Sequence, residues 1–417
     1  MRRVWPQAGG APMADPRHYD VAIVGAGIAG AALAVALSKE GLKIALIEAQ
    51  ALDKSTLPAA RGVQDFDSRV SALTPRSRQL IQQLGAWDAI SAYRYCRYRH
   101  MTVWDGEGTG QIEFDGAEVG LPALGYIVEN RAIVSALLAR VHAATGITVL
   151  SPVALKSCAR LPASQMQLEL DDGELLKADL LVAADGALSR VRQMMDFQCR
   201  EWDYGHRAIV ATLQVTRPHE ATARQRFLPS GPLALLPLPG TDDHHYCSMV
   251  WSLQDDLVDN ILALDDAAFC AELTRVSEAR LGPVLGSSRR FAYPLRQRHA
   301  VDYVQPGVAL VADAAHTIHP LAGQGINLGL QDVAVLAEEI LAGLQRGASP
   351  GSLEVLRRYQ RRRKGENLLM MTAMEGFKRL FEQQSLPLRW LRNSGMRGVD
   401  KLLPVKQQIM RRAMGLG

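Results

Sequence analysis

Three segments rich in glycine and aspartate lie far apart in this chain of 417 residues, and their residue types suit contact with phosphates and hydroxyl groups. The first is a GxGxxG pattern at residues 25–30, the second is Ala184-Asp185-Gly186, and the third extends from Ala312 to Gly325. The first segment alone indicates only a dinucleotide. Because the third lies near the far end of the chain, we predict a ligand held at both ends, as FAD is.

The glycine pattern stands between two elements that can position it. Residues 20–24 are predicted to form a strand, and residues 28–39 the helix that follows it. Gly25 and Gly27 permit a tight turn and a close approach to a pyrophosphate, and Gly30 lets the helix pack on the strand. The N-terminus of that helix offers free N–H groups and positive dipole charge to phosphates.

Two acidic residues extend this interpretation. Glu48 ends the next predicted strand, residues 42–48, about twenty residues after the glycines, where an acid accepts hydrogen bonds from ribose. Asp313 follows a predicted buried strand, and its carboxylate suits the hydroxyl groups of ribitol. A helix starting at Gly325-Ile326-Asn327 can stabilise negative charge on a flavin ring. The alternative for the third segment is an ordinary strand–loop–helix junction.

Taken together, the motifs resemble the group A flavin aromatic hydroxylases, and among these the ubiquinone-biosynthesis hydroxylases that act on polyprenylated phenols. The resemblance extends from about Asp20 to Gly417. Val103-Trp104-Asp105 and residues 250–253 make the chain most similar to the branch that hydroxylates ring position C5. The chain has Ala183 and Ala312 where the family usually has glycine. The remaining motifs that carry the resemblance are residues 25–30 with Glu48, Arg69–Leu73, Ile127–Arg131, Ala184–Arg192, Asp313–Gly329 and the tail Arg411–Leu416.

The resemblance implies a role for each matching residue. Glu48 would hold the adenosine ribose, Arg69 would lie against the flavin or its pyrophosphate, and Asp313 would hold ribitol. Asp185 and Gly186 would lie where FAD and the nicotinamide both pass. Arg131 is a further cofactor contact, although a salt bridge at a helix start is the alternative for Arg69 and Arg131. The residues implied to line the isoalloxazine are Pro320, Gly323, Gln324, Gly325, Ile326 and Asn327, with Pro320 near the hydroxylated ring and Pro320, Gly323 and Gln324 forming the catalytic set.

The resemblance also implies the chemistry. Reduced FAD and O₂ form a C4a-hydroperoxide that transfers oxygen to an electron-rich ring, so water must be kept out of the pocket. NAD(P)H would be the co-substrate. The sequence has no second GxGxxG, which fits transient docking of the nicotinamide dinucleotide. No catalytic base can be named from the sequence.

The predicted fold class is α/β: a Rossmann-like FAD-binding domain of the para-hydroxybenzoate hydroxylase type, with an inserted, mostly antiparallel substrate sheet and a helical C-terminal tail. Residues 69–84 are predicted to be helical, and strands are predicted at residues 206–215, 233–238, 246–253 and 290–295. The domain prediction is a disordered lead-in at 1–19, a discontinuous FAD-binding domain at 20–92, 121–195 and 296–350, a substrate domain at 93–120 and 196–295, and a helical region at 351–417.

Composition also bears on nucleic-acid binding, disulfides, metal sites and localisation. The 47 basic and 43 acidic residues give a net charge of +4, which does not indicate nucleic acid. The 5 cysteines form no CxxC pair, so we expect reduced thiols rather than disulfides or zinc. His316 and His319 lack a matching carboxylate pattern, and no metal site is predicted. Without a signal peptide or a spanning segment, the protein is expected to be cytoplasmic.

The tail and the activity leave alternatives open. From Gly376 onward, apolar and basic residues alternate, which suits either a peripheral position on the inner face of the inner membrane or docking onto the protein's own domain or onto a partner. The resemblance implies other ubiquinone-biosynthesis proteins as partners. The basic run of residues 357–364 is interpreted as a solvated helix. The alternative activities are hydroxylation of a small soluble phenol, flavin-dependent reduction of prenyl double bonds, and a non-enzymatic FAD-containing scaffold.

Overall fold

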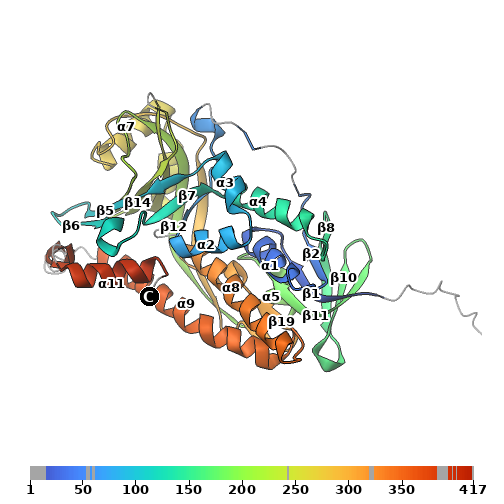
Figure 1. Cartoon of the computed structure of the whole chain (residues 1–417). Helices are drawn as coiled ribbons and strands as arrows, with labels where there is room; N and C mark the ends of the chain where they lie inside the picture. The colour runs from blue at the N-terminus through green and yellow to red at the C-terminus, as the bar shows by residue number, and fades with distance from the viewer. Residues whose placement is uncertain are drawn as a thin grey trace, which may run out of the picture.

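The structure is a computed structural model of the whole chain. It describes residues 16–52, 57–58, 62–241, 244–318, 324–382, 393–396, 398–400 and 402–415. In Figure 1 a parallel sheet with its helices occupies one half of the molecule, and a second sheet with α7 occupies the other.

The first sheet has eight strands in the order β18-β19-β11-β1-β2-β8, with β10 and β9 attached beside β11. The strands β19, β11, β1, β2 and β8 run parallel to one another, whereas β18 is antiparallel to β19. Apolar residues fill the second half of β1 and the whole of β2, as expected where both faces of a parallel sheet are covered. The strands are β1 Arg17–Val24, β2 Ile44–Ile47, β8 Ile147–Leu150, β9 Leu155–Arg160, β10 Met166–Leu170, β11 Leu175–Ala183, β18 Val304–Gln305 and β19 Val308–Leu310.

Helices cover this sheet. α1 is apolar all round and packs against α4 and α8, as expected of a helix buried in the core. The helices and single 3₁₀ turns along the chain are α1 Ile28–Ser38, Val63–Asp65, α2 Pro75–Gln83, α3 Trp87–Tyr93, Gly116–Val119, α4 Asn130–Ala143, Pro162–Ser164, α5 Arg190–Met194, α6 Asp255–Leu262, α7 Asp266–Val276, Ala312–Ala314, α8 Gln324–Gln345, α9 Leu353–Glu382 and α11 Leu403–Ala413.

The second sheet has nine strands in the order β20-β17-β12-β15-β14-β13-β5-β6, with β16 attached to β12. Its pairs are antiparallel except β13 with β5. β20 lies within the third glycine–aspartate segment and pairs with β17. The second sheet is therefore joined to the segment predicted to hold the flavin. Its strands are β5 His100–Asp105, β6 Gln111–Asp115, β12 Cys199–Val215, β13 Thr222–Leu228, β14 Gly231–Leu238, β15 His245–Gln254, β16 Val284–Ser287, β17 Phe291–Ala300 and β20 His316–Thr317.

A small third sheet contains β4 Cys96–Tyr98, β7 Gly125–Glu129 and β3 Val70–Leu73. The prediction of one helix over residues 69–84 was therefore wrong in its first part. Residues 70–73 pair with β7, and Thr74 then caps α2, accepting a hydrogen bond from the Ser77 N–H, with Pro75 as the first helical residue. A cap followed by proline is the local signal for that boundary.

The predicted α/β class is confirmed, with a parallel sheet, a second, mostly antiparallel sheet and helical α9 and α11 near the C-terminus. The predicted helix after the GxGxxG pattern is also confirmed. The disordered lead-in predicted for residues 1–19 was too long. β1 begins at Arg17, where residues 17–19 pair with β11, and residues 1–15 lie outside the described part of the chain.

Candidate active site

The GxGxxG turn joins β1 to α1 at the carboxyl edge of the parallel sheet. Gly25 has φ +102°, and a Cβ there would lie 2.5 Å from the Ala184 carbonyl oxygen. A Cβ at Gly30 would lie 1.8 Å from the Gly25 carbonyl oxygen. By contrast, no atom lies within 4 Å of a Cβ built on Gly27, the residue that precedes α1. The turn therefore requires two of its glycines for packing and leaves open space at the helix N-terminus.

Glu48 lies beside this turn, directly after β2. Its carboxylate accepts hydrogen bonds from the Ala26 N–H at 2.8 Å and from the Gln50 N–H at 3.0 Å. The side chain is half-buried. These bonds fix the carboxylate next to the glycine turn. At that position an acid can accept hydrogen bonds from ribose hydroxyl groups.

Asp185 follows β11, the neighbour of β1. One carboxylate oxygen, Oδ2, accepts the N–H groups of Arg190 at 2.7 Å and Val191 at 3.2 Å, at the start of α5. The other, Oδ1, is buried and has no hydrogen-bond partner among the described residues. Gly186 has φ +81°, and a Cβ built there meets no atom within 4 Å. A buried acceptor beside open space fits a ligand that donates a hydrogen bond.

Asp313 lies one strand further along the sheet, after β19. Its side chain is half-buried, and no donor among the described residues hydrogen-bonds to its carboxylate. Burial raises the pKa of Asp313, and the positive charges of His316 and Arg69 oppose that rise. Because β19, β11 and β1 are adjacent and parallel, Asp313, Asp185 and the glycine turn meet at one edge. This unpartnered carboxylate fits a polyol with hydroxyl donors.

α8 begins directly after the predicted isoalloxazine loop. Gln324, Gly325, Ile326 and Asn327 form its first turn. The Asn327 amide accepts the Thr74 N–H at 2.9 Å and donates to the Ala72 carbonyl at 2.9 Å, which ties α8 to the end of β3. The predicted catalytic residues Pro320 and Gly323 lie outside the described residues, and Gln324 is described by its backbone alone.

The two predicted arginine contacts differ. Arg69 is exposed, and its guanidinium lies 6.0 Å from the centroid of the Tyr293 ring. Arg131 instead pairs with Glu129 at 2.6 Å and also donates to the Asp65 carbonyl. Arg69 thus projects from the edge of the site, whereas the Arg131 guanidinium bonds to protein groups at the start of α4.

A buried polar cluster behind Asp313 was missed at the level of sequence. The Asp332 carboxylate accepts bonds from the Ala312 N–H at 3.1 Å, the His316 ring at 2.5 Å and the Arg363 guanidinium at 2.7 Å. Arg363 also donates to Asn367 at 2.7 Å. Burial alone would raise the pKa of Asp332, but His316 and Arg363 outweigh it and lower that pKa. The cluster fixes the segment that carries Asp313.

One signal for this cluster was present in the sequence. Asp332 is a lone carboxylate in an apolar stretch of α8, and such a residue needs a buried partner. Arg363 belongs to the basic run predicted to be a solvated helix, yet only 2% of it is exposed. That prediction was wrong for Arg363, because the pattern of the run does not show which position faces α8.

Metal ligation has no support in the described part of the chain. No group of three or more His, Cys, Asp or Glu side chains is placed there to hold an ion. His316, which drew attention in the sequence, bonds to Asp332 instead, and His319 lies outside the described residues.

Comparison with known proteins agrees with this geometry. The family model described as the FAD binding domain matches residues 18–372. The chain is 38% identical over 397 residues to the 3-demethoxyubiquinol 3-hydroxylase of Escherichia coli K12, covering 95% of this chain and 98% of that protein. It is 37% identical to the ubiquinone hydroxylase UbiL of Rhodospirillum rubrum, covering 95% and 89%. With the human mitochondrial ubiquinone biosynthesis monooxygenase COQ6 the identity is 34%, covering 94% and 92%.

Solved structures share the fold. The probable FAD-dependent monooxygenase PqsL of Pseudomonas aeruginosa matches with a TM-score of 0.75 at 21% identity, covering 92% of this chain and 100% of that one. The p-nitrophenol 4-monooxygenase PnpA of Pseudomonas putida DLL-E4 matches with a TM-score of 0.74 at 18% identity, covering 95% and 99%.

Proposed function

The chain belongs to the FAD binding domain family of flavin monooxygenases, and we propose that it hydroxylates the aromatic ring of a polyprenylphenol intermediate of ubiquinone biosynthesis, at ring position C5. The observation that most strongly supports hydroxylation in ubiquinone biosynthesis, apart from the ring position, is the 38% identity to the 3-demethoxyubiquinol 3-hydroxylase over 95% of the chain. FAD is the cofactor, NAD(P)H is the co-substrate, and O₂ supplies the oxygen atom.

The chain's own residues supply binding and orientation. Gly25 and Gly27, at the N-terminus of α1, would hold the pyrophosphate, while Glu48 would receive the adenosine ribose. Asp185 Oδ1 and the Asp313 carboxylate are open acceptors for hydroxyl groups. When bound, FAD takes electrons from NAD(P)H and activates O₂. The protein must then keep water away from the ring, which Pro320 and Gly323 are predicted to line.

Ring position C5 is supported only by the segments around Trp104 and Trp251. Both tryptophans are buried in the second sheet, at 4% and 2% exposure. Arg280 lies over the Trp104 ring at 5.0 Å. Because both side chains are buried, their proposed effect on the ring position is through the shape of the sheet rather than by contact with the substrate.

The last described helix supports a place at a lipid surface. α11 turns Lys406 and Met410 inward, where Lys406 pairs with Glu118 at 2.8 Å. Its exposed residues include the apolar Leu403, Val405 and Ile409, each at least 40% exposed, together with polar residues such as Gln408. Met410 packs inward on Leu124, so α11 presents apolar residues both to the protein and outward, whereas a solvated helix has one apolar face, packed on the core.

The charge around α11 favours an anionic bilayer as the surface it contacts. Arg411 and Arg412 are exposed at its C-terminal end, beside the apolar face. A helix with these two features lies in the headgroup region of anionic membranes. None of the described helices is both long and apolar enough to cross a bilayer. We therefore place the protein peripherally, at the inner face of the inner membrane, where a polyprenylated substrate resides.

Vesicle sedimentation tests this surface. The double variant Leu403→Ser/Ile409→Ser should bind phosphatidylglycerol vesicles roughly 30-fold more weakly, because two apolar side chains lose burial of about 2 kcal/mol in total. Leu285→Ser is the matched control, since Leu285 is 59% exposed on β16. Equal loss in the control, or no loss in the double variant, would contradict the membrane assignment.

The activity itself is tested with purified, FAD-loaded protein. A 5-unsubstituted prenylphenol should accelerate NAD(P)H oxidation and yield a product that carries one atom from ¹⁸O₂ at C5. Oxygen incorporation at another ring carbon would refute the position, and a saturated prenyl chain without ¹⁸O would indicate a reductase. Turnover of a small phenol carboxylate instead would favour the second candidate. The exposed Arg69, whose guanidinium has no hydrogen bond or ion pair with the residues that the structure describes, offers a carboxylate anchor for it.

A further inference from the structure

A cluster of apolar side chains, called the outer cluster here, lies beneath α11, the helix proposed to rest on lipid. Three of its members are methionines, whose unbranched and flexible side chains can rearrange around an inserted chain. A hydrocarbon chain that leaves a bilayer at α11 would meet this cluster first. Its members are Tyr98, Met101, Phe114, Val119, Leu121, Leu124, Met410 and Met414.

A second group, the inner cluster, lies between the small third sheet and the second sheet. In the third sheet, Cys96 of β4, Ile127 of β7 and Ala72 of β3 are paired in register and form one apolar row. Residues of β14 and β15 in the second sheet pack with this row, so the two sheets enclose an apolar layer. The members of the inner cluster are Val63, Phe66, Val70, Ala72, Cys96, Tyr98, Ile127, Leu236, Leu238 and Tyr246.

Tyr98 is the residue that the two clusters share. Its ring lies over Gly125, where a Cβ would be only 2.7 Å from the Tyr98 hydroxyl oxygen. The side chain is half-buried, and its hydroxyl forms no hydrogen bond with the residues that the structure describes. Because no hydrogen bond holds the ring in place, its rotation can connect the outer cluster with the inner one.

The inner cluster ends beside the predicted flavin loop. The Ala72 carbonyl accepts a hydrogen bond from the Asn327 amide at 2.9 Å, and Asn327 belongs to the first turn of α8. Two residues along β4 and two strand spacings separate Tyr98 from Ala72, a distance of about 12 Å. The two clusters together therefore provide an apolar lining from α11 to the start of α8.

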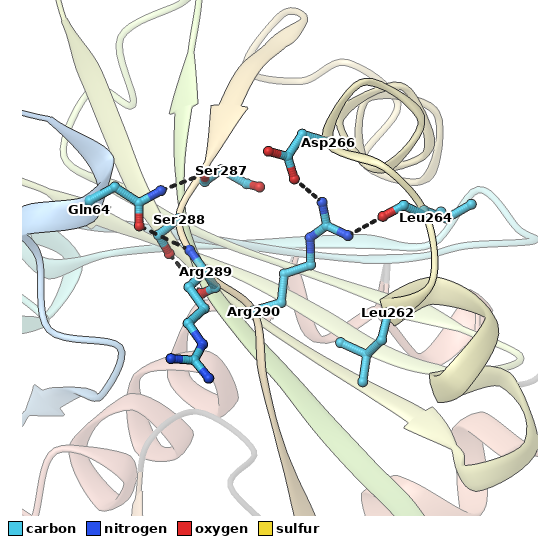
Figure 2. A pocket seen from close by; sticks show the side chains of 8 residues that line it. All are labelled: Gln64, Leu262, Leu264, Asp266, Ser287, Ser288, Arg289 and Arg290. Atoms are coloured by element: carbon cyan, nitrogen blue, oxygen red, sulfur yellow. Dashed lines mark hydrogen bonds and ion pairs between the residues drawn. The ribbon is translucent and has the colours of Figure 1, made fainter.

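A separate hollow, drawn in Figure 2, does not offer such a lining. It has a volume of about 470 Å³ and lies at the end of β16, where Arg290 pairs with Asp266. The Gln64 amide and the side chains of Ser287 and Ser288 also line it. A hydrocarbon chain placed there would take water from these polar groups at a cost in free energy.

We propose that the outer and inner clusters form a track that binds the prenyl chain of the substrate, with Tyr98 at the junction. The chain enters beneath α11, and its ring end reaches the first turn of α8. The inference rests on the proposed function for a prenylated substrate. It also gives α11 a role at the mouth of the track, where Lys406 fixes the helix to Glu118 and Met410 packs on Leu124.

Calorimetric titration of FAD-loaded protein with geranylgeraniol, a prenyl alcohol that has no aromatic ring, tests the track. Met101→Gln preserves the length of the side chain but places an amide in the outer cluster, so binding should weaken about tenfold. In turnover, the KM for a tetraprenylphenol should rise about tenfold while kcat and the KM for a monoprenylphenol stay unchanged. Met195→Gln is the matched control, because Met195 is also a partly buried methionine but packs on the core of the first sheet.

Photolabelling gives a second measurement. Geranylgeraniol with a diazirine at its hydrocarbon end should label the unmodified protein within residues 96–124 or 402–415. The proposal would be overturned by labels confined to other segments, by full affinity in Met101→Gln, or by equal weakening in Met195→Gln. Should Met101→Gln not fold, the labelling decides. Because neither binding measurement needs NAD(P)H or a phenol, a failure here is distinct from a failure of the hydroxylation assay.

Discussion

Ala312 is the residue whose replacement tests the geometry of the flavin segment most directly. Its φ is +53°, a left-handed conformation that costs a residue with a Cβ roughly 1–2 kcal/mol. Glycine in its place removes that cost but increases the entropy of the unfolded chain by about 0.5–1 kcal/mol. We therefore expect Ala312→Gly to stabilise the protein by about 0.5–1 kcal/mol.

The change in melting temperature follows from the size of the chain. With 417 residues, the unfolding entropy is about 0.9 kcal/mol per degree, so Ala312→Gly should raise the midpoint by about 1 °C. Ala315→Gly is the matched control three residues on, where φ is −91° and the residue is 2% exposed. It should lower stability by about 1.5 kcal/mol, since it loses a buried methyl group and gains unfolded-state entropy.

A double-mutant cycle sharpens the test. A Cβ on Gly329 would lie 2.7 Å from the Ala312 Cβ, so Gly329→Ala alone should destabilise by about 1–3 kcal/mol. In the Ala312→Gly background, the atom nearest to the new Cβ at position 329 is the Cα of residue 312, at 3.3 Å. Alanine at position 329 then stabilises α8 by up to about 1 kcal/mol relative to glycine. A coupling of at least about 1 kcal/mol is expected in chemical denaturation. Additive effects, or destabilisation by Ala312→Gly, would refute the reasoning.

Three further predictions concern the carboxylates and the buried histidine. Asp313→Asn should weaken FAD binding to apoprotein about tenfold in a flavin-fluorescence titration, because a neutral amide accepts hydrogen bonds less strongly, and unchanged affinity would contradict its role. Asp332→Asn should lower the free energy of unfolding by about 3–5 kcal/mol because Arg363 loses its buried partner, whereas a loss below about 1 kcal/mol would show the pair to be unimportant. Burial lowers the pKa of His299 to about 4 from its usual 6.5, so the unfolded chain binds more protons between these values. The free energy of unfolding should therefore fall by up to about 3 kcal/mol as the pH drops from 6.5 to 4. In His299→Gln, chemical denaturation across this pH range should show a smaller dependence of that free energy on pH.

Local motifs made part of the site predictable. Gly25 and Gly30 are fixed by contacts within the turn and with the neighbouring strand, and the distance from these glycines to Glu48 is set by one strand–helix–strand unit. Asp185 and Asp313 could be predicted because each directly follows a strand of the same parallel sheet. In all these cases the residue's neighbours in sequence determine its place.

Other features depend on partners that are distant in sequence. Residues 70–73 were predicted as helix because nothing local shows that they pair with β7, more than fifty residues later. Arg363 has arginine or lysine on both sides in sequence, and only its position on α9 opposite α8 separates it from them. The hollow drawn in Figure 2 is also a product of tertiary structure, since its lining comes from residue 64, from residues 262–266 and from residues 287–290.

The strained residue and the buried ion pair belong to one arrangement. Asp332 accepts the Ala312 N–H and also binds His316, so it holds both ends of the segment that contains Asp313. An aspartate without a cation could not remain charged in that buried position, and Arg363 supplies the cation from α9. The left-handed conformation of Ala312 thus depends on a helix fifty residues away. For this reason Arg363→Met alone should allow Ala312 to leave its left-handed conformation. The stabilisation produced by Ala312→Gly should then be smaller in that background than in the unmodified chain.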